Sequence, residues 1–292
     1  MAVVQGEVYS EALGMNTKIA AILPDEAMTS KYGREKRYPT LYMLHGALWT
    51  GFHTLFGTNI EANVSAMFPE LAVIMPSANF SFYTDYVKEF RYAHQYRTFI
   101  ADELVDITRK LFPLSDKREE TAIYGQSMGG FGAYGAGLNH PETFGYVGSQ
   151  SGMVDIGWAV DTREFMRLKH ERMFGKPVVI KRSEHDYYKV ASDLAAGNGP
   201  KPSIFQCWGE KDYLRDINEK MYEHMKTLNL DYTAYRIPEG YHSWGIDNKN
   251  DVGIRIFLKW LKEKMLGVKD LTSVGEEVAP FFVNDYAQYE KL

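Results

Sequence analysis

The chain has 292 residues, of which 45% are hydrophobic and 14% aromatic, so it is long enough to bury a large core as a single domain. Its net charge of -5 comes from scattered Lys, Arg, Asp and Glu without a basic stripe, which argues against nucleic acid or a membrane surface as partner. The segment from Met1 to Glu7 lacks the pattern of a signal peptide and no apolar run reaches the length of a membrane span, so we expect a cytoplasmic protein.

Short apolar runs that end in glycine or polar residues recur along the chain and are typical of buried strands. They cover residues 17–23, 40–44, 71–75, 121–124, 146–149, 203–208 and 232–237. Helical periodicity occupies Tyr96 to Leu111, the stretch from Leu214 to Leu228 and a last helix that includes Val252 to Leu261. Strands that alternate with helices predict an α/β fold, with a mostly parallel central sheet and helices on both faces. In such sheets ligands bind beyond the carboxyl ends of the strands.

The strand at 121–124 is followed by Gly125-Gln-Ser-Met-Gly129 and then by a run of very small residues, which is the layout of a nucleophile elbow. Only glycine-sized neighbours at positions 125 and 129 let the strand and the next helix approach closely enough around a sharp turn. The start of that helix directs free N–H groups and its positive dipole end at the reacting centre. The pattern therefore predicts Ser127 as a nucleophile.

Two later strand ends carry residues that could activate this serine. The strand at 203–208 precedes Asp212, and the strand at 232–237 precedes His242. Imidazole can accept the serine proton and return it to the leaving group, and a carboxylate can hold the imidazole in the required tautomer. The chain order Ser127, Asp212, His242 is that of α/β-hydrolases.

Other acidic residues compete with Asp212 for this role. Asp216 falls near the start of the helix that runs from Leu214, where the helix dipole alone favours an acidic residue. Asp247 and Asp251 follow His242 closely and are expected in a loop and at the N-terminus of the last helix.

The strand at 40–44 is followed by His45-Gly-Ala-Leu48, which is the expected site of an oxyanion loop. The backbone N–H groups of Ala47 and Met128 are predicted to bind the oxyanion, with Leu48 as the alternative donor to Ala47. We expect His45 to brace the loop rather than to react.

The sequence indicates neither a metal-binding site nor an internal disulfide. Cys207 is the only cysteine, so the chain cannot form an internal disulfide, and its apolar surroundings predict a small buried side chain. His185-Asp186 is an isolated pair without further ligands at metal spacing. We therefore predict no bound metal.

Five motifs together resemble the esterase D family of α/β-hydrolases over roughly residues 15 to 262. They are Leu44-His-Gly-Ala47, Tyr83-Thr-Asp85, Gly125-Gln-Ser-Met-Gly-Gly130, Cys207-Trp-Gly-Glu-Lys-Asp212 and Gly240-Tyr-His-Ser-Trp244. The chain is most similar to the tributyrin esterase branch, which is related to acetyl-xylan and feruloyl esterases and to S-formylglutathione hydrolases. The resemblance implies the α/β-hydrolase fold, a triad of Ser127, Asp212 and His242, and hydrolysis of a small-molecule carboxylic ester without a cofactor.

Two segments depart from the simplest members of that family. We predict a single domain over residues 1–266, in which residues of about 153–200 form a small cap region, and a C-terminal extension over 267–292. Trp158 in the cap, together with Trp49 and Trp244, is expected to line the substrate pocket, although aromatic cap residues can equally be ordinary packing. The apolar part of the extension would pack on its own domain or on a neighbouring subunit, which leaves a homo-oligomer open.

The leading functional hypothesis is a serine carboxylesterase that acts on short-chain acyl esters, because bulky rings near the oxyanion loop and after residue 75 would shorten the acyl pocket. An acetyl or feruloyl-type saccharide esterase, an S-formylglutathione hydrolase and an acyltransferase are alternatives with the same chemistry. A catalytically silent hydrolase fold used for binding is the non-enzymatic alternative, since fold alone does not establish activity. The complete and correctly ordered triad argues against the silent fold.

Overall fold

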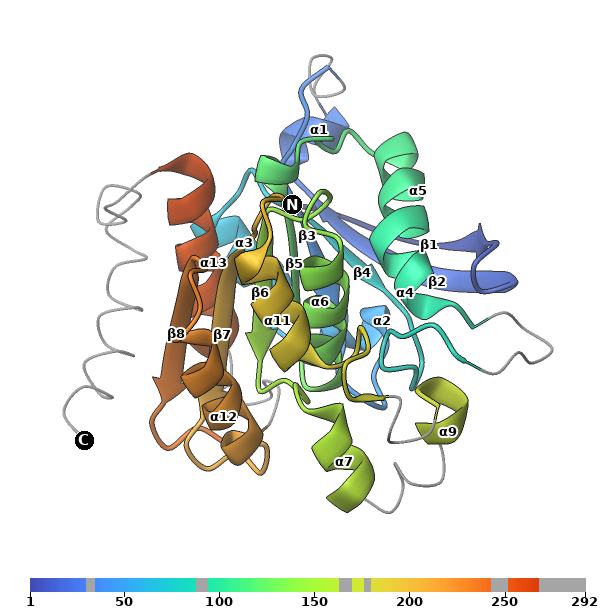
Figure 1. Cartoon of the computed structure of the whole chain (residues 1–292). Coiled ribbons are helices and arrows are strands. Elements are labelled where there is room, and N and C mark those ends of the chain that lie inside the picture. The colour runs from blue at the N-terminus through green and yellow to red at the C-terminus, as the bar shows by residue number, and fades with distance from the viewer. Residues whose placement is uncertain (30–34, 88–93, 163–169, 176–179, 243–251, 268–292) are drawn as a thin grey trace.

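The computed structural model describes residues 1–29, 35–87, 94–162, 170–175, 180–242 and 252–267. Its centre is an eight-stranded sheet in the order β1-β2-β4-β3-β5-β6-β7-β8 (Figure 1). The strands are β1 (Ala2–Ser10), β2 (Met15–Leu23), β3 (Thr40–Leu44), β4 (Ala72–Pro76), β5 (Thr121–Gln126), β6 (Tyr146–Gln150), β7 (Ser203–Gly209) and β8 (Tyr232–Ile237). Neighbouring strands from β4 to β8 run parallel, whereas β1 pairs antiparallel with β2 and β2 antiparallel with β4. The predicted mostly parallel sheet is therefore confirmed.

Strand β1 is absent from the sequence-based prediction. It pairs with β2 along its whole length, from Ala2 opposite Leu23 to Ser10 opposite Met15. Nearly all of its side chains are exposed or half-buried, because it lies at the edge of the sheet. An edge strand that contacts water does not need the continuous apolar run by which a buried strand is recognised.

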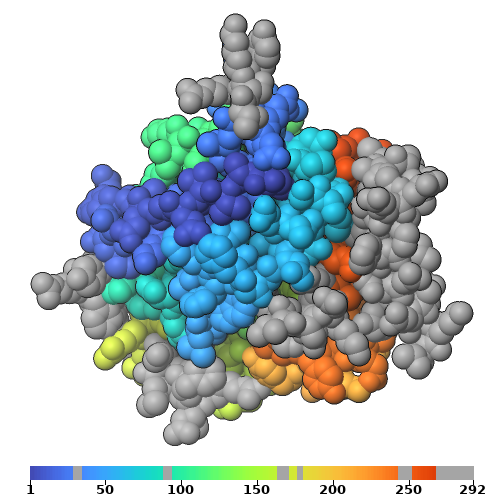
Figure 2. All heavy atoms as spheres, turned by 180° about the vertical axis from the view of Figure 1, so that it is seen from behind, coloured from blue at the N-terminus to red at the C-terminus, as the bar shows by residue number. Residues whose placement is uncertain are grey.

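Helices cover both faces of the sheet, as the sequence predicts. One face carries α4 (Tyr96–Thr98), the π-helical turn η1 (Phe99–Glu103), α5 (Leu104–Leu111), α6 (Met128–Asn139), α11 (Tyr187–Ala196) and α12 (Arg215–Met225). The other face carries α2 (Gly51–Gly57), α3 (Ile60–Met67) and α13 (Val252–Leu266). Figure 2 shows this second face, with the segment of α2 and α3 in light blue and α13 in red beside it. The short α1 (Asp25–Thr29) lies between β2 and β3, and the 3-10 turn η2 (Arg118–Glu120) lies between α5 and β5.

Apolar side chains form one core on each side of the sheet. Along β3, Tyr42 and Leu44 belong to the core under α5 and α6, whereas Leu41 and Met43 belong to the core under α3 and α13. This alternation follows from the two-residue period of a strand and explains why the central strands are apolar throughout.

Helix α6 lies unusually close to the sheet, which accounts for its run of small residues. A Cβ atom on Gly137 would lie 2.3 Å from Val147 Cγ2 in β6, and one on Gly130 would lie 2.6 Å from Ser149 Oγ in the same strand. Larger residues on this face would push the helix away from the strands. The small residues therefore fix the position of the helix that begins directly after Ser127.

The predicted cap region divides into two parts in the structure. Helices α7 (Ile156–Thr162) and α9 (His170–Met173) lie beyond the ends of the strands, whereas α11 lies alongside α6 and α12 in the helical layer (Figure 1). Tyr187 and Ala191 of α11 are buried in the main core. A helix that connects the parallel strands β6 and β7 has to cross back over the sheet, so the part of 153–200 that can form a cap ends before α11.

The C-terminal extension that we predict over 267–292 lies outside the described residues apart from Gly267, so its packing stays a prediction. Among the helices that the structure does describe, none is both long and apolar enough to cross a membrane.

Glu103, at the end of η1, ties the helical segment to the turn between β1 and β2. Its carboxylate accepts hydrogen bonds from Ser10 Oγ and from the backbone N–H of Glu11, at 2.6 Å, and of Ala12, at 3.4 Å. Loss of the carboxylate leaves these donors without their charged partner.

We therefore expect Glu103→Ala to lower the free energy of unfolding by about 2 kcal/mol, as measured by urea denaturation. Asp106→Ala is the matched control, because Asp106 is exposed and pairs with Lys110 one helical turn later, a contact that contributes about 0.5 kcal/mol or less. Equal losses in the two variants would contradict the bracing role of Glu103.

Candidate active site

Ser127 occupies a strained turn between β5 and α6. Its backbone has φ 55° and ψ -118°, a conformation that a residue with a side chain rarely adopts. A Cβ atom on Gly125 would lie 2.3 Å from the backbone of Gly129, and a Cβ atom on Gly129 would lie 2.2 Å from the carbonyl oxygen of Leu44. Both positions therefore require glycine, and the strand, turn and helix form the sharp elbow that the sequence pattern predicts.

The three residues of the expected triad lie together in the structure, although they come from distant parts of the chain. Ser127 Oγ lies 2.9 Å from His242 Nε2, and His242 Nδ1 lies 2.9 Å from Asp212 Oδ1. The Asp212 side chain is fully buried, whereas 18% of the His242 side chain is exposed. This arrangement allows the imidazole to accept the serine proton while the carboxylate holds the opposite ring nitrogen.

Asp212 and Asp216 differ sharply in their surroundings. Asp212 Oδ1 also accepts a hydrogen bond of 2.8 Å from the backbone N–H of Leu214, which fixes the carboxylate beneath the imidazole. Asp216 is exposed on α12 and binds the guanidinium of Arg215 at 2.8 Å. Of these two carboxylates Asp212 is the one that contacts His242, whereas Asp247 and Asp251 lie outside the described residues.

Gln126 links the nucleophile to the histidine loop, a contact that the sequence analysis missed. Its side chain is fully buried, and Nε2 donates a hydrogen bond of 3.4 Å to the carbonyl oxygen of His242. The only sequence signal is a polar residue directly before Ser127 at the end of an otherwise apolar strand. The loops of Asp212 and His242 are also joined, because Lys211 N–H donates to the carbonyl oxygen of Gly240 at 2.8 Å.

The predicted oxyanion loop forms a tight turn after β3. The N–H of Trp49 donates to the carbonyl oxygen of Gly46 at 3.3 Å, and Leu48 has φ 66°, as the third residue of a type II turn requires. A Cβ atom on Gly46 would lie 3.7 Å from Ser127 Cβ, so the turn lies against the nucleophile. Ala47 and Leu48 follow Gly46 in this turn, and the N–H group of either one stays the predicted oxyanion donor.

His45 holds this turn in place from beneath, as expected. It is fully buried, its Nε2 accepts the N–H of Ala78 at 2.9 Å, and its Nδ1 therefore donates to the carbonyl oxygen of Gly46 at 2.7 Å. The Tyr83 hydroxyl adds a hydrogen bond of 3.0 Å to the carbonyl oxygen of His45. Burial lowers the pKa of His45 to about 4, so the ring stays neutral at physiological pH.

The tryptophans that we predicted to line the substrate pocket have different environments. The indole of Trp49 packs on α2, with its ring centroid 6.2 Å from that of His53 and its far edge 3.1 Å from the position of a Cβ on Gly57. Trp158 on α7 is half-buried and packs against the main core. Trp244 lies outside the described residues, so a pocket-lining role stays a prediction for all three.

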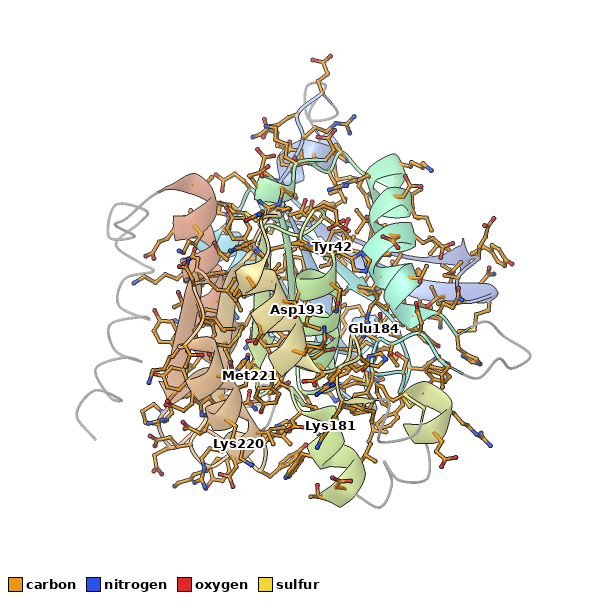
Figure 3. All side chains as sticks on the ribbon, viewed as in Figure 1. Tyr42, Lys181, Glu184, Asp193, Lys220 and Met221 are labelled. Atoms are coloured by element: carbon orange, nitrogen blue, oxygen red, sulfur yellow. The ribbon has the colours of Figure 1, made fainter. Side chains whose placement is uncertain are left out.

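A cavity of about 410 Å³ lies between α7 and the segment before α11. The first residue of its lining, Val154, directly follows Met153 in the chain. The N–H of Met153 donates a hydrogen bond of 3.1 Å to the carbonyl oxygen of Ser127. Figure 3 labels Lys181 of its lining, close to α7. The lining consists of Val154, Asp155, Ile156, Gly157, Ile180, Lys181, Arg182, His185, Asp186, Tyr187 and Tyr188. The cavity is therefore a neighbour of the elbow and does not include the triad.

The lining of this cavity includes a buried histidine, His185. His185 Nδ1 lies 2.9 Å from Arg97 Nη2, and the Arg97 side chain pairs with Glu184 at 2.9 Å. Burial, and then the nearby guanidinium of Arg97, lower the pKa of His185 to about 3. A neutral His185 accepts the hydrogen bond of the guanidinium, so this polar group fastens the segment before α11 to α4.

Neither metal ligands nor a reactive thiol accompany this arrangement in the described parts of the chain. They contain no group of three or more His, Cys, Asp or Glu side chains that could hold a metal ion. Cys207 is fully buried in β7, and burial raises the pKa of its thiol.

Comparison with known proteins places the chain among esterases. The family model described as "Putative esterase" matches residues 10–245. An acetyl esterase of Caldicellulosiruptor saccharolyticus is 31% identical over 258 residues, which cover 85% of this chain and 95% of that protein.

Solved structures of serine hydrolases have a similar fold. The substrate-bound fluorophosphonate-binding serine hydrolase F of Staphylococcus aureus gives a TM-score of 0.78 at 26% identity, covering 89% of this chain and 98% of that one. An S-formylglutathione hydrolase of Staphylococcus aureus, as apoenzyme, gives a TM-score of 0.76 at 26% identity, with the same coverage of 89% and 98%.

The buried His45 predicts a specific pH dependence of stability. Between pH 6.5 and about 4 the unfolded chain binds a proton at this histidine that the folded chain does not bind, so the free energy of unfolding falls as the pH falls through this window. His45 contributes at most about 1.4 kcal/mol per pH unit to the slope of the free energy of unfolding against pH. We expect this part of the slope to be absent in His45→Gln. Urea denaturation of both proteins at pH 7, 6, 5 and 4.5 measures the two slopes. Parallel curves would show that His45 is not held neutral by burial.

Proposed function

The chain belongs to the esterase family, and from this we propose that Ser127, His242 and Asp212 are its catalytic triad and that it hydrolyses short-chain acyl esters. The observation that carries the proposal is the line of two hydrogen bonds of 2.9 Å from Asp212 through His242 to Ser127 Oγ. Its substrate is a small-molecule ester, and the roles of the individual residues follow from the geometry around Ser127.

In the first half of the reaction His242 Nε2 takes the hydroxyl proton as Ser127 Oγ attacks the ester carbonyl carbon. The carbonyl oxygen becomes an oxyanion, which the N–H of Met128 and that of Ala47 or Leu48 stabilise. Collapse of this intermediate breaks the bond to the alcohol oxygen, which takes the proton from His242. The products of this half are the free alcohol and an acyl group on Ser127.

In the second half a water molecule replaces the alcohol. His242 removes a proton from the water as its oxygen attacks the acyl carbon, and the acid leaves when the proton returns to Ser127 Oγ. Asp212 stabilises the imidazolium in both halves, and its full burial strengthens this interaction because little water competes for the carboxylate.

The proposed preference for short acyl groups rests on relatives and on packing. The relative from Caldicellulosiruptor saccharolyticus is named an acetyl esterase, which supports an acetyl group as the acyl part. Phe82 directly precedes Tyr83, whose hydroxyl binds the carbonyl oxygen of His45. Phe82 is buried against Phe131 and Phe174, with ring centroids 5.7 Å and 6.0 Å away, so it has little room to move aside for a long chain.

Alternative functions use the same proposed triad. A thioester such as S-formylglutathione, a feruloyl ester, or an alcohol as acyl acceptor would all pass through an acyl group on Ser127, and substrate comparison separates them. Membership in an esterase family and the aligned triad argue against a silent binding fold. A cytoplasmic location and a homo-oligomer stay predictions.

Asp212→Asn should reduce kcat by several orders of magnitude, on the order of 10⁴, because the amide can hold the imidazole in the wrong tautomer. The measurement is kcat with p-nitrophenyl acetate. Asp216→Asn is the matched control, since Asp216 is an exposed neighbour on α12, and its kcat should stay within about twofold.

Ser127→Ala completes this series. It should remove both turnover and covalent labelling by a serine-directed fluorophosphonate. Adding His242→Ala to Ser127→Ala should lower the residual turnover little further, because triad members act as a unit. A larger loss from Asp216→Asn than from Asp212→Asn, or labelling of Ser127→Ala, would refute the assignment.

The acyl preference has a separate test. We expect kcat/KM to be highest for p-nitrophenyl acetate or butyrate and to fall about tenfold or more for octanoate and palmitate, since a long chain would have to displace buried aromatic rings. Methyl ferulate serves as the aromatic acyl substrate. A palmitate optimum would refute the short pocket, and a ferulate optimum would make the substrate a phenolic ester.

A further inference from the structure

Tyr213 contacts the proposed catalytic histidine directly. It follows Asp212 in the chain, and the centroid of its ring lies 4.1 Å from that of the His242 imidazole at an interplanar angle of 50°. Although the ring packs on His242, 55% of Tyr213 is exposed. A large, partly apolar surface is therefore exposed immediately beside the imidazole.

The position of this surface relates it to one part of the substrate. The alcohol oxygen of the ester must come within hydrogen-bond reach of His242 Nε2, about 3 Å, to receive its proton when the acyl group moves to Ser127. The remaining atoms of the alcohol extend outward from that oxygen. Tyr213 packs against the same imidazole, so its exposed ring lies beside the group that must protonate the alcohol oxygen.

We propose that Tyr213 is a specificity-determining residue whose exposed ring binds the leaving alcohol and favours alcohols with a six-membered ring that presents a broad apolar face, either a pyranose or an aryl group. This inference rests on the proposed function. The apolar face of such a ring can lie on the tyrosine ring, where it loses contact with water and gains dispersion contacts. A short linear alcohol offers too little surface to gain as much.

The neighbouring Tyr241 is exposed to a similar extent but has a different environment. It is 62% exposed and directly precedes His242, yet its ring lies 5.6 Å from Lys211 Nζ, which also pairs with Glu239. Its ring contact is thus with a cation rather than with the imidazole. Tyr241 is therefore a matched control for Tyr213, because the two share residue type, exposure and proximity to His242 in the chain.

The test compares acetate esters that differ only in the alcohol: ethyl acetate, benzyl acetate and a mono-O-acetylated methyl xylopyranoside. All three give the same acetyl group on Ser127, so kcat/KM reports only steps in which the alcohol is still present. In Tyr213→Ala we expect kcat/KM to fall about tenfold for a ring-bearing alcohol and at most about threefold for ethyl acetate. Tyr213→Phe should keep the wild-type preference, and so should Tyr241→Ala.

The two kinds of ring are separated by the same measurements. A selective loss with the xylopyranoside alone assigns a sugar alcohol, and a selective loss with benzyl acetate alone assigns an aryl alcohol. An equal fall for all three esters in Tyr213→Ala, together with a shifted pH profile of kcat/KM, would overturn the proposal, because the ring would then only position His242. An equal selective loss in Tyr241→Ala would also overturn it.

Fluorophosphonate labelling distinguishes failure of this inference from failure of the proposed function. Tyr213→Ala should still be labelled at Ser127, because the probe needs the serine and the histidine but no alcohol ring. A wild-type protein that neither reacts with the probe nor hydrolyses any of the acetates would overturn the proposed function and this inference with it.

Discussion

The close approach of helix α6 to the parallel strands is the constraint on which the rest of the site depends. At the elbow, atoms of Gly129 and Leu44 are so near that a single added Cβ would lie 2.2 Å from a carbonyl oxygen. This contact holds Ser127 at φ 55° and directs the start of α6 at the reacting centre. The small residues farther along α6 keep the helix equally close to the strands. Packing along the whole helix therefore holds Ser127 in its strained conformation.

Buried polar side chains then connect the loops that follow separate strands. His45 supports the turn after β3, Gln126 binds the carbonyl oxygen of His242 after β8, and Asp212 holds the imidazole from the loop after β7. Each of these side chains is buried, where a hydrogen bond competes with little water and an unpaired group is costly. These hydrogen bonds connect the three loops beneath the serine, which suits stabilisation of an oxyanion by donors that are already in place.

The opposite side of the site is more open. His242 is partly exposed, Tyr213 extends from it toward solvent, and Leu48 at the tip of the oxyanion turn is 87% exposed. A buried, fixed half beside an exposed half fits a reaction in which the acyl group stays bound while an alcohol leaves and water enters. On this basis we propose that specificity for the alcohol depends on a few exposed side chains, whereas the chemistry depends on the triad and the buried side chains that hold it.

The sequence by itself determined the features that depend on neighbours along the chain. We could identify from the sequence the seven apolar runs, the glycines around Ser127 and the order Ser127, Asp212, His242, because strand periodicity and turn chemistry act over a few residues. Strand β1 was not predicted, because an edge strand that contacts water needs no continuous apolar run. Tertiary structure alone decided that α11 joins the helical layer and that Gln126 and Tyr213 contact His242. The physical reason is that these contacts join residues far apart in the chain, as in the 115 positions that separate Ser127 from His242, and only the packing of complete strands and helices sets such distances.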